Sequence, residues 1–472
     1  MLFYNVACLK KIIKRSLLII TSIALIWAVH YAWTAFPIIS GFDAKQVCTC
    51  VFVSNRDTKA LDTSEMAELP FSLGSYEVNT KDSSVTATVW GMAKKKAIYR
   101  KGIGCTLIND ITEQQLRSQV FAIPAPPLLN TDTIPWPYGD KMPDTFPPNI
   151  NITKLKAVVN SAFTAAYKDK KPRTRAVIVV YNGQIIAEQY APGFSKDTKM
   201  YGWSMAKSFT AALIGTLVKA GKLDVKKHAP VPEWKDAKDP RYAITTEHLL
   251  QQTSGLNFLE DYTKMSDVTN MLYKQGDMAA FTAAHPLAHT PGTVFSYSSG
   301  NSNILSRIIR QTVGEKDYAA YPFTALFYKI GMYHTSVEPD ASGTYVGSSY
   351  INATARDYAR FGLLYYNNGV WNGEHILPED WVQQTTTAPA ANKQKNYGYQ
   401  FWLNGVQANN PSQHIFKDVP ADMFYCDGYA GQYIYIIPSR KLVVVRLGLT
   451  LDKSFDENDL SKNIIECIRE KQ

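Results

Sequence analysis

An apolar run near the N-terminus constrains this chain more than any other feature. Residues 16–39 contain no Asp, Glu, Lys or Arg and are rich in Leu, Ile, Ala and Trp. At a rise of about 1.5 Å per residue, a helix of this length can cross the roughly 30 Å hydrocarbon core of a bilayer. The sequence therefore predicts a membrane-crossing helix over residues 16–39.

The charges beside this run predict its orientation. Residues 1–15 form a basic leader with Lys10, Lys11, Lys14 and Arg15, and no comparable cluster follows the run directly. Positive charges favour the cytoplasmic side, so the rest of the chain should lie on the exported side, periplasmic or extracellular. A cleaved signal peptide is the alternative, but no clean small-x-small cleavage site follows a short apolar core. We therefore favour an uncleaved signal anchor.

The cysteines fit an exported chain. Cys48, Cys50 and Cys105 follow the apolar run. In an oxidising compartment a Cys48–Cys105 disulfide is the first expectation, a bridge from Cys50 is the alternative, and buried reduced thiols are the third reading. This spacing does not complete a zinc site, and we expect neither a metal nor another cofactor.

Composition indicates a globular protein outside the membrane helix. The chain has 472 residues, 46% hydrophobic and 19% charged, with a net charge of +9. No basic stripe with interleaved aromatics is present, so nucleic-acid binding is not expected.

Prolines are concentrated in residues 123–148 and predict an extended connector. It would separate an N-terminal exported segment, residues 40–122, from a domain over residues 149–472.

Periodicity and turn residues predict an α+β fold for that domain. The expected helices cover residues 151–167, 303–312, 354–366 and 456–470. The expected hairpins cover residues 176–187 and 432–447, and short strands are expected at 51–53 and 85–89. Since helices and hairpins lie at both ends of the domain, we predict one antiparallel sheet flanked by its N- and C-terminal helices. A mostly helical region would be inserted between the two ends.

A serine and a lysine three residues apart mark the start of one helix. Ser204 and Lys207 lie where an apolar-periodic run begins, so both should share one helix face. A neutral lysine amine could then take the serine proton and prepare the hydroxyl to attack a carbonyl. Unpaired N–H groups at the helix start could stabilise an oxyanion and lower the lysine pKa. On spacing alone, the alternative is a surface lysine after a helix-capping serine.

Two further stretches could complete such a site. Tyr297 lies in a loop between small polar residues, where its phenol could relay protons beside a lysine. Residues 427–432 contain small residues directly before a predicted strand, so a backbone N–H there could be a second oxyanion donor. The simpler readings are a surface tyrosine and an ordinary turn.

Four motifs in order resemble those of a known family. They are Gly202–Ser208, His248–Leu256, Tyr297–Asn301 after Pro291-Gly292, and Gly428–Gln432. In this order they resemble the penicillin-recognising serine hydrolases, with a β-lactamase/transpeptidase-like fold. The chain is most similar to the class C β-lactamase-like branch that contains 6-aminohexanoate-dimer hydrolases and family VIII carboxylesterases. The resemblance covers about residues 150–472.

The resemblance implies catalytic roles for three side chains and two backbone groups. Ser204 matches the acylated serine, Lys207 its base, and Tyr297 the tyrosine that shares protons with the lysine and the leaving group. The oxyanion hole would be formed by the backbone N–H groups of Ser204 and Tyr429. Tyr262, Ser299 and Gly428 would contact the substrate.

Two departures argue against efficient penicillin hydrolysis. Ser299 stands where these enzymes usually have Asn, and residues 423–428 lack the Lys or His that holds a substrate carboxylate. Five aromatic residues of the predicted domain would either line an apolar pocket beside the site or belong to the core. They are Trp203, Trp402, Phe424, Tyr425 and Tyr429.

These observations predict an exported, membrane-anchored serine hydrolase. It would cleave an amide or ester bond of a small molecule or short peptide through an acyl-enzyme on Ser204. One alternative is β-lactamase or D-peptidase activity on peptidoglycan-like substrates. A second alternative, from another class, is a non-catalytic envelope protein that binds such peptides.

Overall fold

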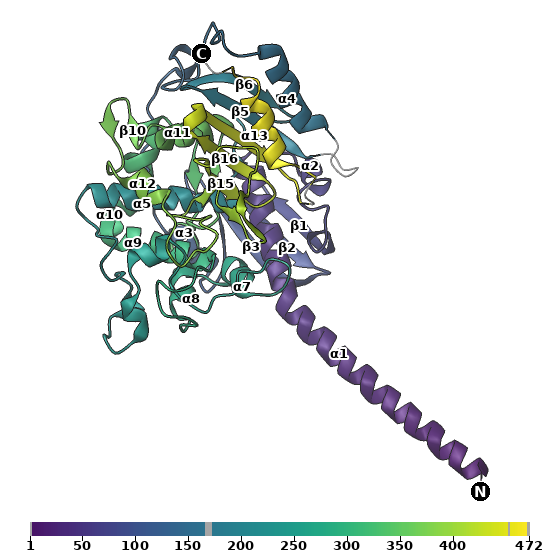
Figure 1. The fold of residues 1–472 in the computed structure, drawn as a ribbon. Coiled ribbons are helices and arrows are strands. Elements are labelled where there is room, and N and C mark those ends of the chain that lie inside the picture. The colour runs from purple at the N-terminus through teal and green to yellow at the C-terminus, as the bar shows by residue number, and fades with distance from the viewer. Residues whose placement is uncertain (1, 166–171, 452–453, 470–472) are drawn as a thin grey trace.

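A long N-terminal helix projects from a globular body in the computed structural model (Figure 1). The structure describes residues 2–165, 172–451 and 454–469, and only the backbone of residues 2–9. The ends that the sequence predicted for two helices, Tyr167 and Glu470, lie outside the described residues. Helix α1 runs over Leu2–Cys48. Among the described residues, it is the one helix long and apolar enough to cross a membrane by length and composition.

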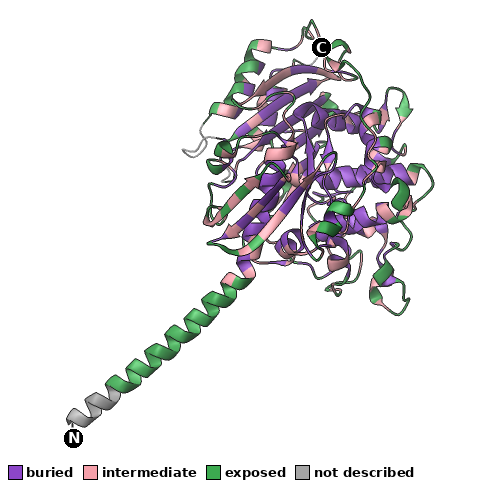
Figure 2. Cartoon of the chain, turned by 180° about the vertical axis from the view of Figure 1, so that it is seen from behind, coloured by how far each residue is buried: buried purple, intermediate pink, exposed green. Residues whose placement is uncertain are grey.

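Helix α1 changes surroundings along its length. Its side chains are exposed from Lys10 to Tyr31, whereas Ala35 and Phe36 are only 8% exposed (Figure 2). From there the helix continues into the body, where Phe42, Ala44 and Val47 belong to a buried apolar cluster. The exposed part therefore ends before residue 39, and the C-terminal part of the same helix is a core element.

A four-stranded antiparallel sheet packs against this buried part of α1. Its strands follow one another in chain order and are β1 Gly74–Asn79, β2 Ser84–Val89, β3 Met92–Arg100 and β4 Gly104–Leu107. The strand predicted at residues 85–89 is confirmed in β2. The strand predicted at residues 51–53 is wrong, because Thr49–Val53 forms a π-helical turn that continues α1. The local preference of β-branched residues for strands yields here to the helix that precedes them.

A disulfide and a buried ion pair fasten α1 to the body. Cys48 is bonded to Cys105 of β4, which confirms the first of the expected pairings, and Cys50 remains a buried thiol. Three residues before Cys48, the Lys45 amine lies 2.5 Å from a carboxylate oxygen of Glu338. Because both side chains are almost fully buried, α1 is anchored to a segment nearly three hundred residues later in the chain.

The central sheet has six antiparallel strands in the order β12-β15-β16-β17-β5-β6. Their bounds are β5 Thr174–Tyr181, β6 Gln184–Tyr190, β12 Trp402–Leu403, β15 Phe424–Gly428, β16 Gln432–Ile437 and β17 Leu442–Gly448. Both predicted hairpins are confirmed, and β17 pairs directly with β5. The two ends of the domain therefore complete one antiparallel sheet, as predicted.

Helices cover both faces of this sheet. On one face lie α4 Ile152–Thr164 and α13 Glu457–Ile465, which share an apolar cluster with β5, β16 and β17. On the other lie α5 Ala206–Lys219, α9 Ser299–Val313 and α11 Ala355–Tyr366. Asn151 caps α4 by accepting a hydrogen bond from the Lys154 N–H. Helix α13 ends at Ile465 and is shorter than predicted, because its last turn gives way to a bridge between Ile468 and Ile150.

The remaining elements are short and lie mostly between β6 and β15. The helices are α2 Thr58–Asp62, α3 Glu113–Ser118, α6 Thr246–Leu250, α7 Asp267–Lys274, α8 Met278–Ala283, α10 Glu315–Tyr318 and α12 Trp381–Thr385. The strands are β7 Met200–Tyr201, β8 Ser336–Val337, β9 Ile351–Ala353, β10 Val370–Trp371, β11 Glu374–His375, β13 Val406–Gln407 and β14 Asn410–His414.

Candidate active site

Ser204 lies on a tight turn that leads into α5. Trp203–Met205 forms a single 3-10 turn, and Trp203 has a φ of 48°, in the left-handed region that non-glycine residues rarely adopt. The strand before the turn is held by pairing of Met200 with Ala353. The first N–H groups of such a turn have no acceptor within it, so the backbone at Ser204 is available to an outside acceptor.

The Lys207 amine lies one turn further, directly beside the serine. Its Nζ is 3.1 Å from Ser204 Oγ, 3.0 Å from Ser299 Oγ and 3.1 Å from the Ser348 carbonyl oxygen. Lys207 is 1% exposed, so the reading as a surface lysine is wrong. Burial lowers the pKa of Lys207 to about 8, against the opposing charges of Glu260 and Asp427. A substantial fraction of this amine is therefore neutral in mildly alkaline solution and can accept a proton.

Tyr297 packs against the same amine. The Lys207 Nζ lies 4.8 Å from the centre of the Tyr297 ring. Burial raises the pKa of the Tyr297 phenol well above its usual value, and a hydrogen bond with Ser204 acts in the opposite direction. The ring is held by Tyr397 and Trp402, at centroid distances of 5.8 and 5.3 Å. The hydroxyl, amine and phenol expected from the sequence thus meet at one place.

A carboxylate network that sequence reasoning missed lies behind Lys207. Ser299 donates to Glu260 from its backbone N–H, at 2.8 Å, and from its hydroxyl, at 2.5 Å. The Tyr262 hydroxyl lies 2.9 Å from Glu260 and 3.2 Å from Ser299 Oγ. Ser299 therefore connects Lys207 to Glu260, and Tyr262 also reaches this connection. The resemblance had indicated Tyr262 as a substrate contact, but it assigned no role to Glu260, whose partner Ser299 lies 39 residues away in the sequence.

The end of β15 reaches the serine turn at backbone distance. A Cβ atom placed on Gly428 would lie 2.2 Å from the carbonyl oxygen of Gly202, so only glycine fits there. Beyond Gly428 the chain turns tightly through Ala430, with a φ of 63°. The ring of Tyr429 lies edge-on against Trp203 at 5.4 Å. This packing brings the backbone at residues 428–429 to the serine turn, where the sequence predicted a second N–H donor.

A large cavity opens beside Ser204, which we call the active-site cavity. It has a volume of about 710 Å³. Its polar lining includes Ser204, Tyr262, Tyr297 and Asp427, and burial raises the pKa of Asp427 to about 7. Of the aromatic residues considered from the sequence, Trp203, Trp402 and Tyr429 line this cavity, whereas Phe424 and Tyr425 are buried in core clusters. The size and mixed lining are those of a small-molecule site.

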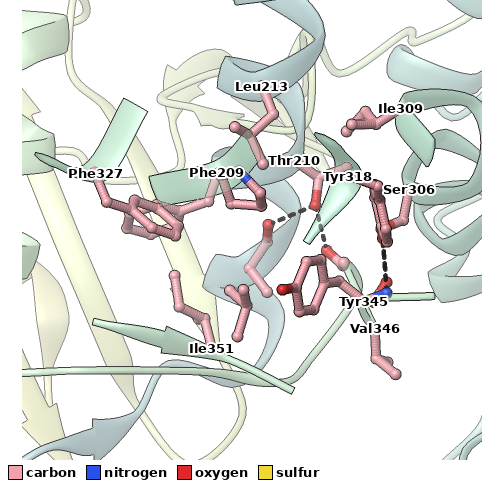
Figure 3. Close-up of a pocket in the computed structure, with 14 residues that line it drawn as sticks. Phe209, Thr210, Leu213, Ser306, Ile309, Tyr318, Phe327, Tyr345, Val346 and Ile351 are labelled. Carbon is pink, nitrogen blue, oxygen red and sulfur yellow. Dashed lines mark hydrogen bonds between the residues drawn. The ribbon is translucent and has the colours of Figure 1, made fainter. Parts of the chain in front are cut away.

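A second pocket near α5 is too small to compete. Figure 3 shows it between α5 and α9, where Thr210 donates to the Gly347 carbonyl and Ser306 to the Tyr345 carbonyl. Its volume is about 20 Å³, which is room for about one water molecule. It is a packing defect behind the helix that carries Lys207, whereas the active-site cavity has room for a substrate and contains Ser204 in its lining.

The protein family described as beta-lactamase matches residues 159–465, well over half of the chain. The chain belongs to the beta-lactamase family. It is 23% identical over 298 residues to a 6-aminohexanoate-dimer hydrolase from Paenarthrobacter ureafaciens, covering 58% of this chain and 72% of that relative. These findings agree with the family resemblance seen in the four motifs.

Solved structures agree on the fold. A putative 6-aminohexanoate-dimer hydrolase from Bacillus anthracis is similar with a TM-score of 0.51 and 25% identity, covering 63% of this chain and 78% of that one. A family VIII carboxylesterase is similar with a TM-score of 0.52 and 16% identity, covering 68% and 98%. This chain of the beta-lactamase family is thus a hydrolase with the fold of amide- and ester-cleaving relatives.

Proposed function

We propose that this member of the beta-lactamase family is a membrane-anchored serine hydrolase that cleaves an amide or ester bond through an acyl-enzyme on Ser204. One observation carries the proposal: the buried Lys207 amine lies 3.1 Å from the Ser204 hydroxyl. The described partners of this amine are two hydroxyls and a carbonyl, so no carboxylate in direct contact holds its proton. A buried lysine in such surroundings is suited to work as a base.

In the first half-reaction, neutral Lys207 takes the Ser204 proton while Ser204 Oγ attacks the substrate carbonyl carbon. The N–H groups of Ser204 and Tyr429 stabilise the oxyanion. The single bond between the acyl carbon and the leaving oxygen or nitrogen then breaks, and the leaving group takes a proton from Lys207 through the Tyr297 phenol. The phenol suits this relay because its pKa is raised and it stays protonated.

In the second half-reaction, water enters and gives one proton to Lys207, relayed by the Tyr297 phenol, as its oxygen attacks the acyl carbon. The bond to Ser204 breaks, the serine regains its proton, and a carboxylic acid leaves. Ser299 and Glu260 hold the amine in position throughout, since Ser299 Oγ contacts both groups. Tyr262 and Gly428 border the space that the substrate occupies.

The active-site cavity favours this activity over penicillin hydrolysis. Residues 423–428 carry no Lys, Arg or His, and Asp427 lines the cavity. Above the Asp427 pKa of about 7, its carboxylate repels the carboxylate that β-lactams carry, instead of binding it. A small-molecule or short-peptide amide or ester without a carboxylate beside the scissile bond fits better.

The membrane anchor is part of the proposal. Helix α1 begins with a basic segment and continues as an apolar segment into the body. The positive charges favour a cytoplasmic N-terminus, which leaves the catalytic domain on the exported side. The Cys48–Cys105 disulfide supports this side, because disulfides persist in oxidising compartments.

Labelling with a fluorophosphonate probe tests the proposal. The wild-type protein should be labelled and should hydrolyse p-nitrophenyl acetate, and Ser204→Ala should lose both. Ser296→Ala is the matched control, because Ser296 is an exposed serine beside Tyr297. A folded wild-type protein that neither reacts with the probe nor cleaves the ester would support the non-catalytic alternative. Nitrocefin hydrolysis faster than ester hydrolysis would support the β-lactamase alternative.

A further inference from the structure

The active-site cavity extends from Ser204 to helix α1. We propose that the substrate is an ester or amide that carries a long apolar chain, that this chain lies along α1 in the cavity, and that the substrate enters from the membrane that α1 crosses. This rests on the proposed function, because it assigns the substrate class of the same site.

The lining of the cavity has a polar and an apolar part. Ser204, Tyr297 and Asp427 belong to the polar part. The apolar part consists of side chains of α1 and of the segments that pack on it: Phe36, Ile38, Ile39, Phe42, Phe71 and Leu272. A substrate with a polar scissile group and an apolar tail matches this lining, because burial of the tail is favourable only where the walls are apolar.

The cavity is open where α1 leaves the body. Tyr31 and Ala35 both line the cavity, and Tyr31 is still 46% exposed. The apolar stretch from Ser16 to Trp33 is exposed, except for the half-buried Ala32. At 1.5 Å per residue it is about 27 Å long, close to the roughly 30 Å core of a bilayer. If this stretch spans the membrane, the part of the cavity lined by Tyr31 and Ala35 lies at the membrane surface.

Exposed apolar residues surround the base of α1 at this level. We call Trp33, Leu69 and Trp90 the apolar collar; they are 82%, 73% and 68% exposed. The collar is continuous with the cavity wall, because the Trp90 ring contacts Phe36 at 5.3 Å and Leu69 itself lines the cavity. Exposed apolar side chains grouped around a membrane-length helix fit a surface that rests on lipid. An amphiphile in the outer layer of the membrane could then move into the cavity without crossing water.

The reaction balances with water as co-reactant. Ser204 Oγ forms a bond to the acyl carbon, the bond to the alcohol or amine breaks, and that leaving group departs with a proton. Water then releases the carboxylic acid and restores the serine. The apolar chain belongs to the acyl or the leaving part of the substrate, and two substrate series distinguish these cases.

The test uses the full-length protein in lipid nanodiscs. One series consists of p-nitrophenyl esters from acetyl to dodecanoyl, and the other of acetate esters of alcohols from ethanol to dodecanol. In at least one series, kcat/KM should rise by up to about fourfold per methylene until the cavity is filled. Flat profiles in both series would overturn the inference. If the wild-type protein hydrolyses the acetyl ester no faster than Ser204→Ala does, the proposed function would instead be overturned.

Long esters also concentrate in the lipid, so variants must separate this partition from binding in the cavity. Ile38 lines the cavity and is only partly buried, so Ile38→Asn should fold. Its ratio of dodecanoyl to acetyl kcat/KM, or the same ratio in the alcohol series, should fall about fivefold or more, and Ile38→Val should keep the wild-type ratio. Thermal unfolding verifies the fold of each variant.

A pair of aromatic residues on α1 provides a second, matched comparison. Tyr31 lines the cavity, whereas Trp33, two residues later, is exposed and does not line it. Tyr31→Ala should lower the long-chain to short-chain ratio more than Trp33→Ala does, because only Tyr31 lines the cavity. Partition into lipid is the same for all variants, so equal ratios in wild type, Ile38→Asn and Tyr31→Ala would overturn the inference.

Discussion

Two buried lysines, Lys45 and Lys207, have opposite kinds of partner. Lys45 contacts the Glu338 carboxylate at 2.5 Å, and its other partners include the hydroxyls of Thr49 and Tyr201. Lys207 contacts the hydroxyls of Ser204 and Ser299 and one carbonyl. Burial lowers the pKa of both amines, but at Lys45 the Glu338 charge acts directly against this effect.

The difference indicates which of two equally buried amines is suited to act as a base. A carboxylate in contact keeps a lysine protonated and converts it into a structural cross-link. Hydroxyl and carbonyl partners position a lysine without retaining its proton. Burial alone, or a lowered pKa alone, would have identified both lysines as candidate bases. The group in direct contact with each amine distinguishes their roles, and each of the following experiments tests that distinction.

Removing the proposed base should have the largest effect. Lys207→Met keeps an apolar side chain of similar length but cannot accept a proton, so kcat/KM for p-nitrophenyl acetate should fall by about a thousandfold or more. Lys45→Met is the matched control, since its folded fraction should retain activity. Comparable losses per folded molecule in the two variants would contradict the separation of their roles.

Removing the structural lysine should affect stability instead. Lys45→Met leaves the Glu338 carboxylate buried without its cation, which should lower the free energy of unfolding by about 3–5 kcal/mol. Urea denaturation in detergent measures the change. The double variant with Glu338→Gln should recover part of the loss, because the stranded charge is gone. A double variant as unstable as Lys45→Met would show that the ion pair is not the cause.

The disulfide should contribute less and should leave catalysis intact. Cys48 and Cys105 are separated by 57 positions, and replacing both by serine should lower the free energy of unfolding by about 2–4 kcal/mol. Cys467→Ala, which removes a free thiol and keeps the disulfide, is the control. Unlike the double-serine variant, it should still be sensitive to a reducing agent. Dithiothreitol should destabilise the wild type and the control, and should have no effect on the double-serine variant.

The smallest effect is a shift in pH dependence. Below pH 8 the Lys207 amine is mostly protonated, so kcat/KM should rise about tenfold per pH unit and level off near pH 8. Glu260→Gln should move this midpoint to lower pH by less than about one unit, because the Glu260 charge is the largest that raises the pKa of Lys207. Asp261→Asn is the neighbouring control and should leave the midpoint in place.

The same pKa has a consequence for stability. The folded-state pKa of Lys207, about 8, lies below the ordinary value of 10.5. Between these values the unfolded chain binds more protons than the folded one, so Lys207 makes stability rise with pH in that window. Lys207→Met should remove this part of the pH dependence. An unchanged slope of stability against pH in that variant would contradict the assignment.

Local features of this fold could be predicted from the sequence. The predicted hairpin over residues 176–187 and the predicted helix start at residue 151 depend on neighbouring residues, and both are confirmed. Ser204, Lys207 and Tyr297 could be found because four short motifs occur in a fixed order. Residues 51–53 could not, because a helix that begins far upstream continues through them.

The non-local parts of the site were not accessible from pattern. Glu260 is an acidic loop residue in the sequence, and only the fold brings its carboxylate to Ser299. Nor does hydropathy reveal where α1 enters the globular body, since Phe36 and Ile39 are as apolar as the exposed residues before them. The sequence therefore predicted the N-terminal apolar helix and the catalytic residues separately. Only the tertiary structure shows that this helix lines the same cavity as Ser204 and Tyr297.

That contact has a practical consequence for preparing the enzyme. A shortened version that starts at residue 41, chosen to avoid detergent, would lack the cavity-lining residues Tyr31, Ala35, Phe36, Ile38 and Ile39. Such a soluble fragment could still turn over acetyl esters, because Ser204, Lys207 and Tyr297 lie elsewhere in the chain. Its preference among larger substrates would be that of a cavity without its α1 wall. A compound screen with this fragment would therefore rank the wrong compounds first.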